Sequence, residues 1–153
     1  MKLFFAKLWR TLGLPKNLQL GIMRLFQDQF LIGVTGIIFN DKNQVLLLKH
    51  TYRQTVWSLP GGYIKAKEHP VEGLEREIKE ETGLTVSVDQ ELKVRTDRQS
   101  ARLDICFIGT YIGGAFKKST EVSEAGFFSF DHLPDISKNQ LLLIEHTLRQ
   151  RIQ

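Results

Sequence analysis

Apolar residues recur with two different periods along this chain, and the two periods predict strands and helices in different places. Segments 30–39, 44–52, 84–94 and 101–112 are rich in β-branched and large apolar residues, which predicts four strands, and 126–130 predicts a short fifth. Leu141, Ile144 and Leu148 fall on one face of a helix predicted over 137–150. In the strand at 101–112, Asp104 is expected to point outward. Strands before and after a central helix predict a mixed sheet covered by helices, an α/β fold.

The central helix is predicted between two glycine-rich segments. Gly61 and Gly62 follow a Trp-Ser-Leu-Pro run and predict a sharp loop, because glycine adopts backbone conformations that other residues avoid. A proline in the first turn and helix-forming residues predict a helix over 70–82, with Gly83 as its C-terminal stop. Gly73 lies inside this helix, where glycine costs about 1 kcal/mol relative to alanine. We therefore expect close packing of the helix on the sheet at Gly73.

The first 30 residues carry two apolar stripes at helical spacing, which predict two short amphipathic helices. The stripes are Phe4, Phe5, Leu8, Trp9 and Leu12, and then Leu18, Ile22, Leu25 and Phe26. We expect an N-terminal helical extension over 1–29 and one catalytic domain over 30–153. Neither a spanning helix nor a secretory signal is predicted. The extension has two open interpretations: packing on its own domain or on the partner in a homodimer, and peripheral contact of residues 1–27 with an anionic membrane.

Composition and charge narrow the choice of partners. The 153 residues, 42% hydrophobic and 25% charged, suit one α/β domain without disorder. A single cysteine, Cys106, excludes an internal disulfide and fits a reducing, cytoplasmic location. The net charge of +4 belongs entirely to residues 1–30, which hold five basic residues and one acidic residue. The predicted domain is neutral, so a broad nucleic-acid groove is not expected.

The central helix carries an acidic cluster with the spacing of a metal site. Glu77 and Glu81 are four residues apart and share a face, and Glu80 lies on its flank. Carboxylates so close repel each other, and a divalent cation is the expected compensation. Oxygen ligands favour Mg²⁺, or Mn²⁺, over zinc. Glu68, from the preceding loop, is predicted as a fourth metal ligand or as the ion-pair partner of Arg76.

The segment 62–84 matches a longer pattern of glycine, five residues, glutamate, seven residues, Arg-Glu, an apolar residue, any residue, Glu-Glu, any residue, glycine and an apolar residue. This pattern resembles the signature of the Nudix hydrolases, the MutT-like pyrophosphohydrolases. The resemblance implies an α/β/α sandwich with a mixed sheet from about residue 31 onward. It also implies hydrolysis of a pyrophosphate linkage by water. Glu77, Glu80 and Glu81 are then expected to hold the metal ions, and Arg76 is expected to have an orienting role. In this family the general base is a helix glutamate or one from a later loop, where we rank Glu121 above Glu124.

The substrate is less well determined by the sequence. Gly61, Gly62, Tyr63 and Arg53 are candidate substrate-binding residues. Tyr52 and Phe107 are further candidates for stacking on a base, as Arg95, Arg98 and Arg102 are for binding phosphate. The family's signatures for ADP-ribose, dinucleoside polyphosphates and coenzyme A are absent. Nucleoside triphosphates, other nucleoside diphosphate derivatives and RNA 5′ ends remain, beside the alternative of a catalytically silent nucleotide-binding module.

Overall fold

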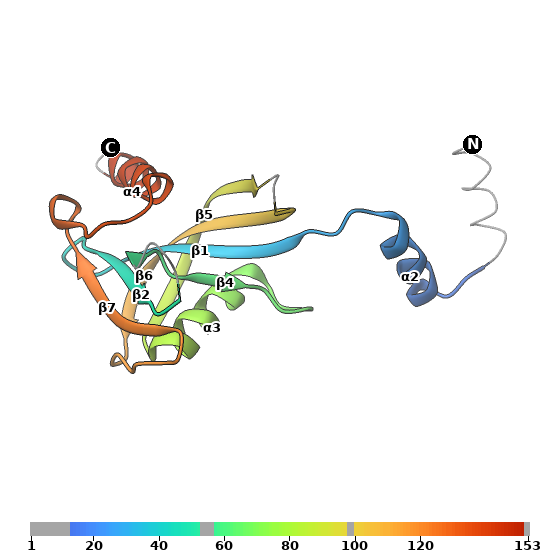
Figure 1. Cartoon of the computed structure of the whole chain (residues 1–153), viewed down its shortest axis with the longest axis horizontal. Coiled ribbons are helices and arrows are strands. Elements are labelled where there is room, and N and C mark those ends of the chain that lie inside the picture. The colour runs from blue at the N-terminus through green and yellow to red at the C-terminus, as the bar shows by residue number, and fades with distance from the viewer. Residues whose placement is uncertain (1–12, 53–56, 98–99, 152–153) are drawn as a thin grey trace. The chain divides into compact units, whose positions relative to one another are not determined.

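The computed structural model describes residues 13–52, 57–97 and 100–151. The chain divides into two compact units, residues 1–30 and 31–153 (Figure 1). In the first unit, helix α2 (Lys16–Phe26) follows Pro15 and has no buried residue. The second predicted amphipathic stripe is thus confirmed as a helix, whereas the first falls outside the described residues. Within the described ranges, no helix has the length and apolarity to span a membrane.

The second unit is built on a seven-stranded mixed sheet. Its strands are β1 (Leu31–Phe39), β2 (Val45–His50), β3 (Trp57–Ser58), β4 (Gly61–Tyr63), β5 (Thr85–Asp97), β6 (Arg102–Gly113) and β7 (Val122–Phe128). Strand β1 runs parallel to β6 along its whole length, from Leu31 opposite Arg102 to Phe39 opposite Thr110. Its other edge is shared between β4, opposite residues 33–35, and β2, which meets it at Phe39. All other pairs are antiparallel, and β7 adds to β2.

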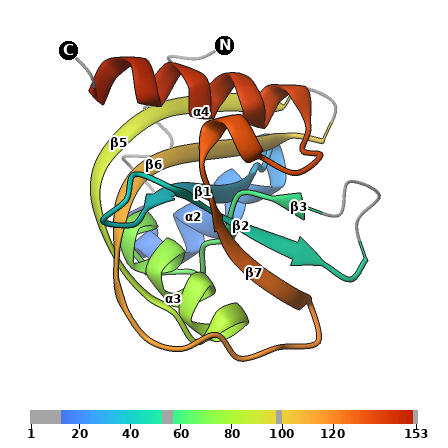
Figure 2. The ribbon, with the colours of Figure 1, turned by 90° about the vertical axis from the view of Figure 1, so that its left-hand side faces the viewer.

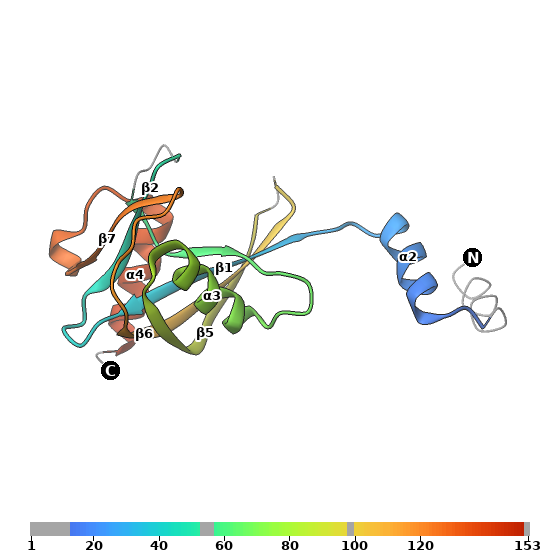
Figure 3. The ribbon, with the colours of Figure 1, turned by 90° about the horizontal axis from the view of Figure 1, so that it is seen from below.

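Two helices cover opposite faces of the sheet (Figures 2 and 3). Helix α3 (Pro70–Thr82) packs through Leu74 and Ile78 on a core that includes Val34 and Ile38 of β1. Helix α4 (Lys138–Arg151) packs through Leu143 and Ile144 on a second core with Ile37, Phe39 and Cys106. A short 3₁₀ turn, η1 (Phe130–His132), precedes α4. Because alternate residues of β1 supply the two cores, the unit is the predicted α/β/α sandwich.

Most predicted elements are confirmed, and the exceptions concern strands β4, β6 and β7. The strand predicted at 126–130 begins earlier, at Val122. The loop interpretation of Gly61 and Gly62 is wrong, because both residues belong to strand β4 and neither has a positive φ. Asp104 does not point outward to solvent: its residue is only 7% exposed. The last two differences are explained by the contacts of Gly61 and Gly62 and by the hydrogen bonds of Asp104.

Candidate active site

The termini of helix α3 are fixed by its own sequence. The His69 side chain accepts from the backbone N–H of Val71, and the Glu72 carboxylate accepts from the backbone N–H of His69 at 3.1 Å. This reciprocal capping box begins the helix. Gly83 ends it with φ of 75°, a left-handed conformation that glycine adopts without strain. The two caps therefore fix where α3 begins and ends, and with that the position of its acidic residues.

Arg76 is the centre of an ion-pair network that joins the helix to the preceding loop. Its Nε and Nη2 donate to the two oxygens of Glu68 at 2.6 and 3.0 Å, a bidentate pair. Its Nη1 donates to Glu77 at 2.8 Å and to Glu80 at 3.0 Å, and Nη2 also donates to the backbone carbonyl of Tyr63 at 3.2 Å. One guanidinium therefore binds three carboxylates, and its bond to the carbonyl of Tyr63 also ties strand β4 to α3.

Gly73 has a different role from the one predicted. A Cβ added to it would lie 2.9 Å from Cγ2 of Ile64 and 3.1 Å from Oε2 of Glu68. The close packing thus occurs against the loop before the helix, and not against the sheet. A larger residue at this position would push against the carboxylate that holds Arg76. Glycine in the middle of the helix is explained by the space that it leaves for the Glu68 carboxylate.

The same network makes the acid stability of the protein depend on Glu68. The hydrogen bonds from Arg76 and from the backbone N–H of Lys65 lower the pKa of Glu68 from 4.5 to about 2. A depressed carboxyl pKa stabilises the folded state above pH 4.5, and this contribution is lost as the pH falls toward 2. We expect Glu68→Gln to reduce the loss of unfolding free energy between pH 4.5 and 2, measured by urea denaturation at several pH values.

A matched control for this prediction is Glu145→Gln. Glu145 also pairs with an arginine, Arg149, but that arginine side chain is 77% exposed, whereas the side chains of Arg76 and Glu68 are only 19% and 15% exposed. Exposed pairs of this kind contribute little to stability. The control should therefore keep the wild-type acid profile. An equally steep acid transition in Glu68→Gln would contradict the role given to this ion pair.

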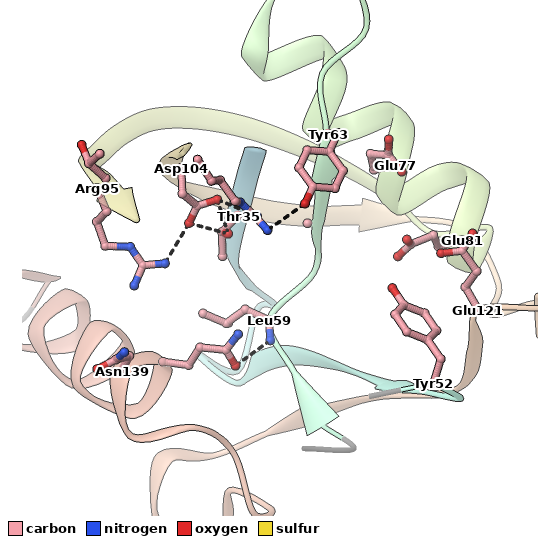
Figure 4. A pocket seen from close by; sticks show the side chains of 15 residues that line it. Thr35, Tyr52, Leu59, Tyr63, Glu77, Glu81, Arg95, Asp104, Glu121 and Asn139 are labelled. Atoms are coloured by element: carbon pink, nitrogen blue, oxygen red, sulfur yellow. Dashed lines mark hydrogen bonds and ion pairs between the residues drawn. The ribbon is translucent and has the colours of Figure 1, made fainter. Parts of the chain in front are cut away.

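A cavity of about 1010 Å³ lies beside the acidic helix (Figure 4). It is lined by Thr35, Tyr52, Leu59, Gly61, Gly62, Tyr63, Glu77, Glu81, Arg95, Thr96, Arg102, Asp104, Glu121, Asn139 and Gln140. Glu77, Glu81 and Glu121 lie together at one end, while Asp104 and Arg95 lie at the other, with Tyr63 between the two groups (Figure 4). The cavity therefore has an acidic end and an end that contains arginine. Its volume is that of a typical small-molecule site.

The two glycines of β4 allow the acidic end to form. A Cβ on Gly62 would lie 2.5 Å from the carboxyl carbon of Glu77, and a Cβ on Gly61 would collide with the backbone carbonyl of Val34. Strand β4 consequently approaches both β1 and α3 more closely than a strand with side chains could. The glycines serve close approach, and not the turn that the sequence suggested.

The structure separates the predicted catalytic residues into two groups. Glu77, Glu81 and Glu121 line the cavity, together with the predicted substrate-binding residues Gly61, Gly62 and Tyr63. Glu68, Glu80 and Arg76 do not line it: Glu80 has a side chain 55% exposed and pairs with Arg76 and Lys65. Arg53 and Arg98 lie outside the described residues. Phe107 is buried in the core beneath α3, and Tyr52 lines the cavity.

Glu121 and Glu124 have different surroundings. The backbone carbonyl of Glu121 accepts from both the N–H and the hydroxyl of Thr51, at 3.0 and 3.3 Å, which fixes the loop that carries it. Its side chain lies at the acidic end of the cavity (Figure 4). Glu124 instead pairs with Lys49 at 2.6 Å across strands β2 and β7. Only Glu121 of the two is a lining residue.

The acidic end has the donor chemistry for a divalent cation. Its donors are carboxylate oxygens from two turns of one helix and from a facing loop, which suits Mg²⁺ or Mn²⁺. Among the described residues, no three acidic, histidine or cysteine side chains already surround one point. Instead Arg76 balances Glu77 and Glu80. Glu68 has both oxygens engaged, by Arg76 and by the backbone N–H of Lys65. Glu68 is therefore held as the ion-pair partner of Arg76.

Asp104 is a site residue that was not predicted from the sequence. Thr35 donates to both of its oxygens at 3.1 Å, Arg95 donates to Oδ2 at 2.8 Å, and Arg102 donates to Oδ1 at 3.1 Å. Burial alone would raise the pKa of Asp104, but the hydrogen bonds and charges of these partners lower it. Burial would likewise lower the pKa of Arg95, and the bond to Asp104 raises it instead. The signal in the sequence is an acidic residue within a mostly apolar strand.

Comparisons with known proteins agree with this geometry. The sequence model of the NUDIX domain matches residues 29–147. An ADP-ribose pyrophosphatase of Methanocaldococcus jannaschii is 35% identical over 124 residues, which cover 77% of this chain and 73% of that protein. A MutT-like protein of Streptomyces ambofaciens is 27% identical over 104 residues, covering 68% of this chain and 67% of that protein.

Solved structures show the same fold. The crystal structure of an ADP-ribose pyrophosphatase from Streptococcus suis has a TM-score of 0.67 and 26% identity, and the alignment covers 79% of this chain and 93% of that one. The family match spans the sheet, both covering helices and the acidic cavity. The chain therefore belongs to the Nudix family, and it is a hydrolase of phosphorus-containing anhydrides.

Proposed function

We propose that this protein catalyses the magnesium-dependent hydrolysis of the diphosphate linkage in a nucleoside diphosphate derivative. The observation that carries the proposal is the two-ended cavity, in which Glu77, Glu81 and Glu121 face a second polar group across Tyr63. A nucleoside diphosphate derivative has the diphosphate in its middle and an organic group on each side. Such a molecule fits this cavity when its diphosphate lies at the acidic end and one of its organic groups lies along the polar surface beyond Tyr63. The ADP-ribose pyrophosphatase relatives support the same class of substrate.

The acidic end supplies the groups that the reaction needs. Glu77 and Glu81, with Glu80 beside them on α3, are the residues that would hold the cation. When bound, Mg²⁺ would neutralise the diphosphate and lower the pKa of a coordinated water. The water oxygen forms a bond to one phosphorus, and the bridging P–O bond breaks, with its electron pair going to the leaving phosphate. Glu121, which lines the same end of the cavity, would accept the proton of the water.

The remaining residues position these groups. Arg76 and Glu68 fix the rotation of the acidic side chains through the bidentate pair, and Gly62 lets strand β4 close over Glu77. The carbonyl of Tyr63 accepts from Arg76, so the wall of the cavity is tied to the same network. Small displacements of reacting groups are costly, because a misplacement of about 1 Å lowers a rate by roughly 100-fold.

The test is a substrate screen with purified protein and Mg²⁺. The panel contains nucleoside diphosphate sugars, nucleoside triphosphates and RNA with a 5′-triphosphate, with EDTA as the control. We expect a nucleoside monophosphate and a sugar phosphate from at least one nucleoside diphosphate sugar, detected by chromatography. Turnover of triphosphates or RNA alone would contradict the proposed substrate class. Tight nucleotide binding without any turnover would instead identify a silent binding module.

A further inference from the structure

The side chains at the arginine end of the cavity also contact one another, yet the hydrolytic reaction does not use them. Arg95 and Arg102 both donate to Asp104, and Arg102 also lies over the ring of Tyr63, 4.9 Å from its centroid. The three charged side chains carry a net charge of +1. The two arginine side chains are about one-third exposed, while the Asp104 side chain is 10% exposed. The arginines, and not the carboxylate, are therefore what a ligand meets.

The charged side chains at this end offer a ligand donors rather than acceptors. Arginine can only donate. Both oxygens of Asp104 already accept, from Thr35 and the two arginines. The side-chain oxygen of Gln140 also accepts, from the backbone N–H of Leu59 at 3.2 Å. The donors that remain for a ligand are those of the exposed part of the two arginine side chains, which are 33% and 32% exposed. A group that presents acceptors suits this end better than one that presents N–H donors.

Tyr63 adds a flat surface. It is 49% exposed, lines the cavity, and stands between the two ends (Figure 4). Its carbonyl is held by Arg76 and its ring by Arg102, so one residue joins the catalytic network to the arginine group. A flat aromatic ligand gains contact with such a surface, whereas a phosphate does not.

Strand β1 makes room for Arg102. A Cβ on Gly33 would lie 2.5 Å from Nη2, 2.7 Å from Nε and 2.8 Å from Cζ of Arg102. Gly33 has no positive φ, so alanine is compatible with its backbone and would act mainly by displacing the guanidinium. The position of Arg102 can thus be changed without removing its charge.

We propose that Arg102 and Arg95 form the nucleobase subsite and select a base that presents a carbonyl oxygen over one that presents an amino group. The inference rests on the proposed function, since it names the base of the same nucleoside diphosphate substrate. Arginine pairs well with the O6 and N7 acceptors of a 6-oxopurine, and such a pair gives roughly tenfold or greater discrimination between bases. Hypoxanthine and uracil are favoured over adenine and cytosine.

The decisive comparison uses substrates that differ at one position of the base. IDP-ribose and ADP-ribose differ in the 6-oxo and 6-amino groups, and UDP-ribose and CDP-ribose differ likewise at position 4. We expect the wild type to prefer IDP-ribose and UDP-ribose by about tenfold or more in kcat/KM. In Arg102→Met the preference should fall below about threefold, through a higher KM for the oxo substrates. Arg149→Met, at an exposed arginine outside this cavity, should keep the wild-type preference.

Gly33→Ala provides the second variant. It should lose the preference as Arg102→Met does, and the double variant should lose no more than either single one. An unchanged preference in both variants would overturn the proposal, as would a wild type that favours ADP-ribose over IDP-ribose. A wild type that instead favours ADP-ribose carrying an additional 2′-phosphate would show an anion subsite, which also overturns it. If no nucleoside diphosphate sugar is cleaved, the proposed function fails, and equilibrium titrations with IDP and ADP still test the subsite.

Discussion

Replacing Glu81 by glutamine should lower kcat by at least about 100-fold while the protein stays folded. Glu81 lines the acidic end of the cavity, one helical turn beyond Glu77, and Glu121 faces it from the loop before β7. The amide keeps the shape of the side chain but removes the negative charge that would hold a cation there. Metal-assisted charge stabilisation is worth several kcal/mol, so its loss has a large effect on the rate. The measurement is kcat with Mg²⁺ on the best substrate of the screen, with the circular dichroism spectrum as the check on folding.

Glu124→Gln is the matched control for this prediction. Glu124 lies on β7, three residues beyond Glu121, but its carboxylate pairs with Lys49 and it does not line the cavity. We expect its kcat to remain within about threefold of the wild type, because an exposed pair contributes less than about 1 kcal/mol. Full activity of Glu81→Gln, or an equal loss in Glu124→Gln, would show that the acidic end has been assigned to the wrong residues.

Replacing Arg76 by lysine should lower activity by about 10- to 100-fold, although the positive charge is retained. Lysine has no planar fork, so it cannot bind both oxygens of Glu68 and also reach Glu77, Glu80 and the carbonyl of Tyr63. Residues that orient metal ligands typically contribute this much to metal affinity or rate. We expect the Mg²⁺ concentration that gives half-maximal rate to rise together with the fall in kcat, as measured by metal titration of the steady-state rate.

Arg149→Lys tests whether the effect is specific to the fork of Arg76. Arg149 forms a pair with Glu145 four residues earlier on α4, and its side chain is 77% exposed. Its replacement should leave both kcat and the Mg²⁺ dependence unchanged. A wild-type metal titration in Arg76→Lys would contradict the orienting role and reduce Arg76 to a source of charge alone.

The sequence predicted the elements better than it predicted the contacts between them. Helix α3 was delimited correctly because its signals are local: a proline in the first turn and a glycine at the C-cap. Strand β4 was missed because it is three residues long and is defined only by its partners in β1 and α3. Glycine is compatible with both a turn and a close approach, and only the tertiary structure distinguishes the two.

Prediction of the site from the sequence has the same limit. The acidic residues of α3 were found because their spacing on one helix is itself the signal. The grouping of Thr35, Arg95, Arg102 and Asp104 depends on the pairing of β1, β5 and β6, which bring together residues up to 69 positions apart. Their separate sequence contexts contain no common pattern. The sequence therefore offers Arg95 and Arg102 only as separate candidates, and their grouping around Asp104 requires the tertiary structure.

The parallel pairing of β1 with β6 also has a consequence for the order in which the molecule folds. Residues 31–39 pair with residues 102–110, and the whole of α3 lies within the loop that this pairing closes. Loop-closure entropy opposes so distant a contact until other contacts compensate for it, and non-local topologies fold slowly for that reason. During synthesis on the ribosome, the segment of α3 emerges before β6, so the acidic residues are made before the sheet that they face is complete. The cavity also needs Glu121, Asn139 and Gln140, which follow β6, so its lining is complete only after most of the chain has been synthesised.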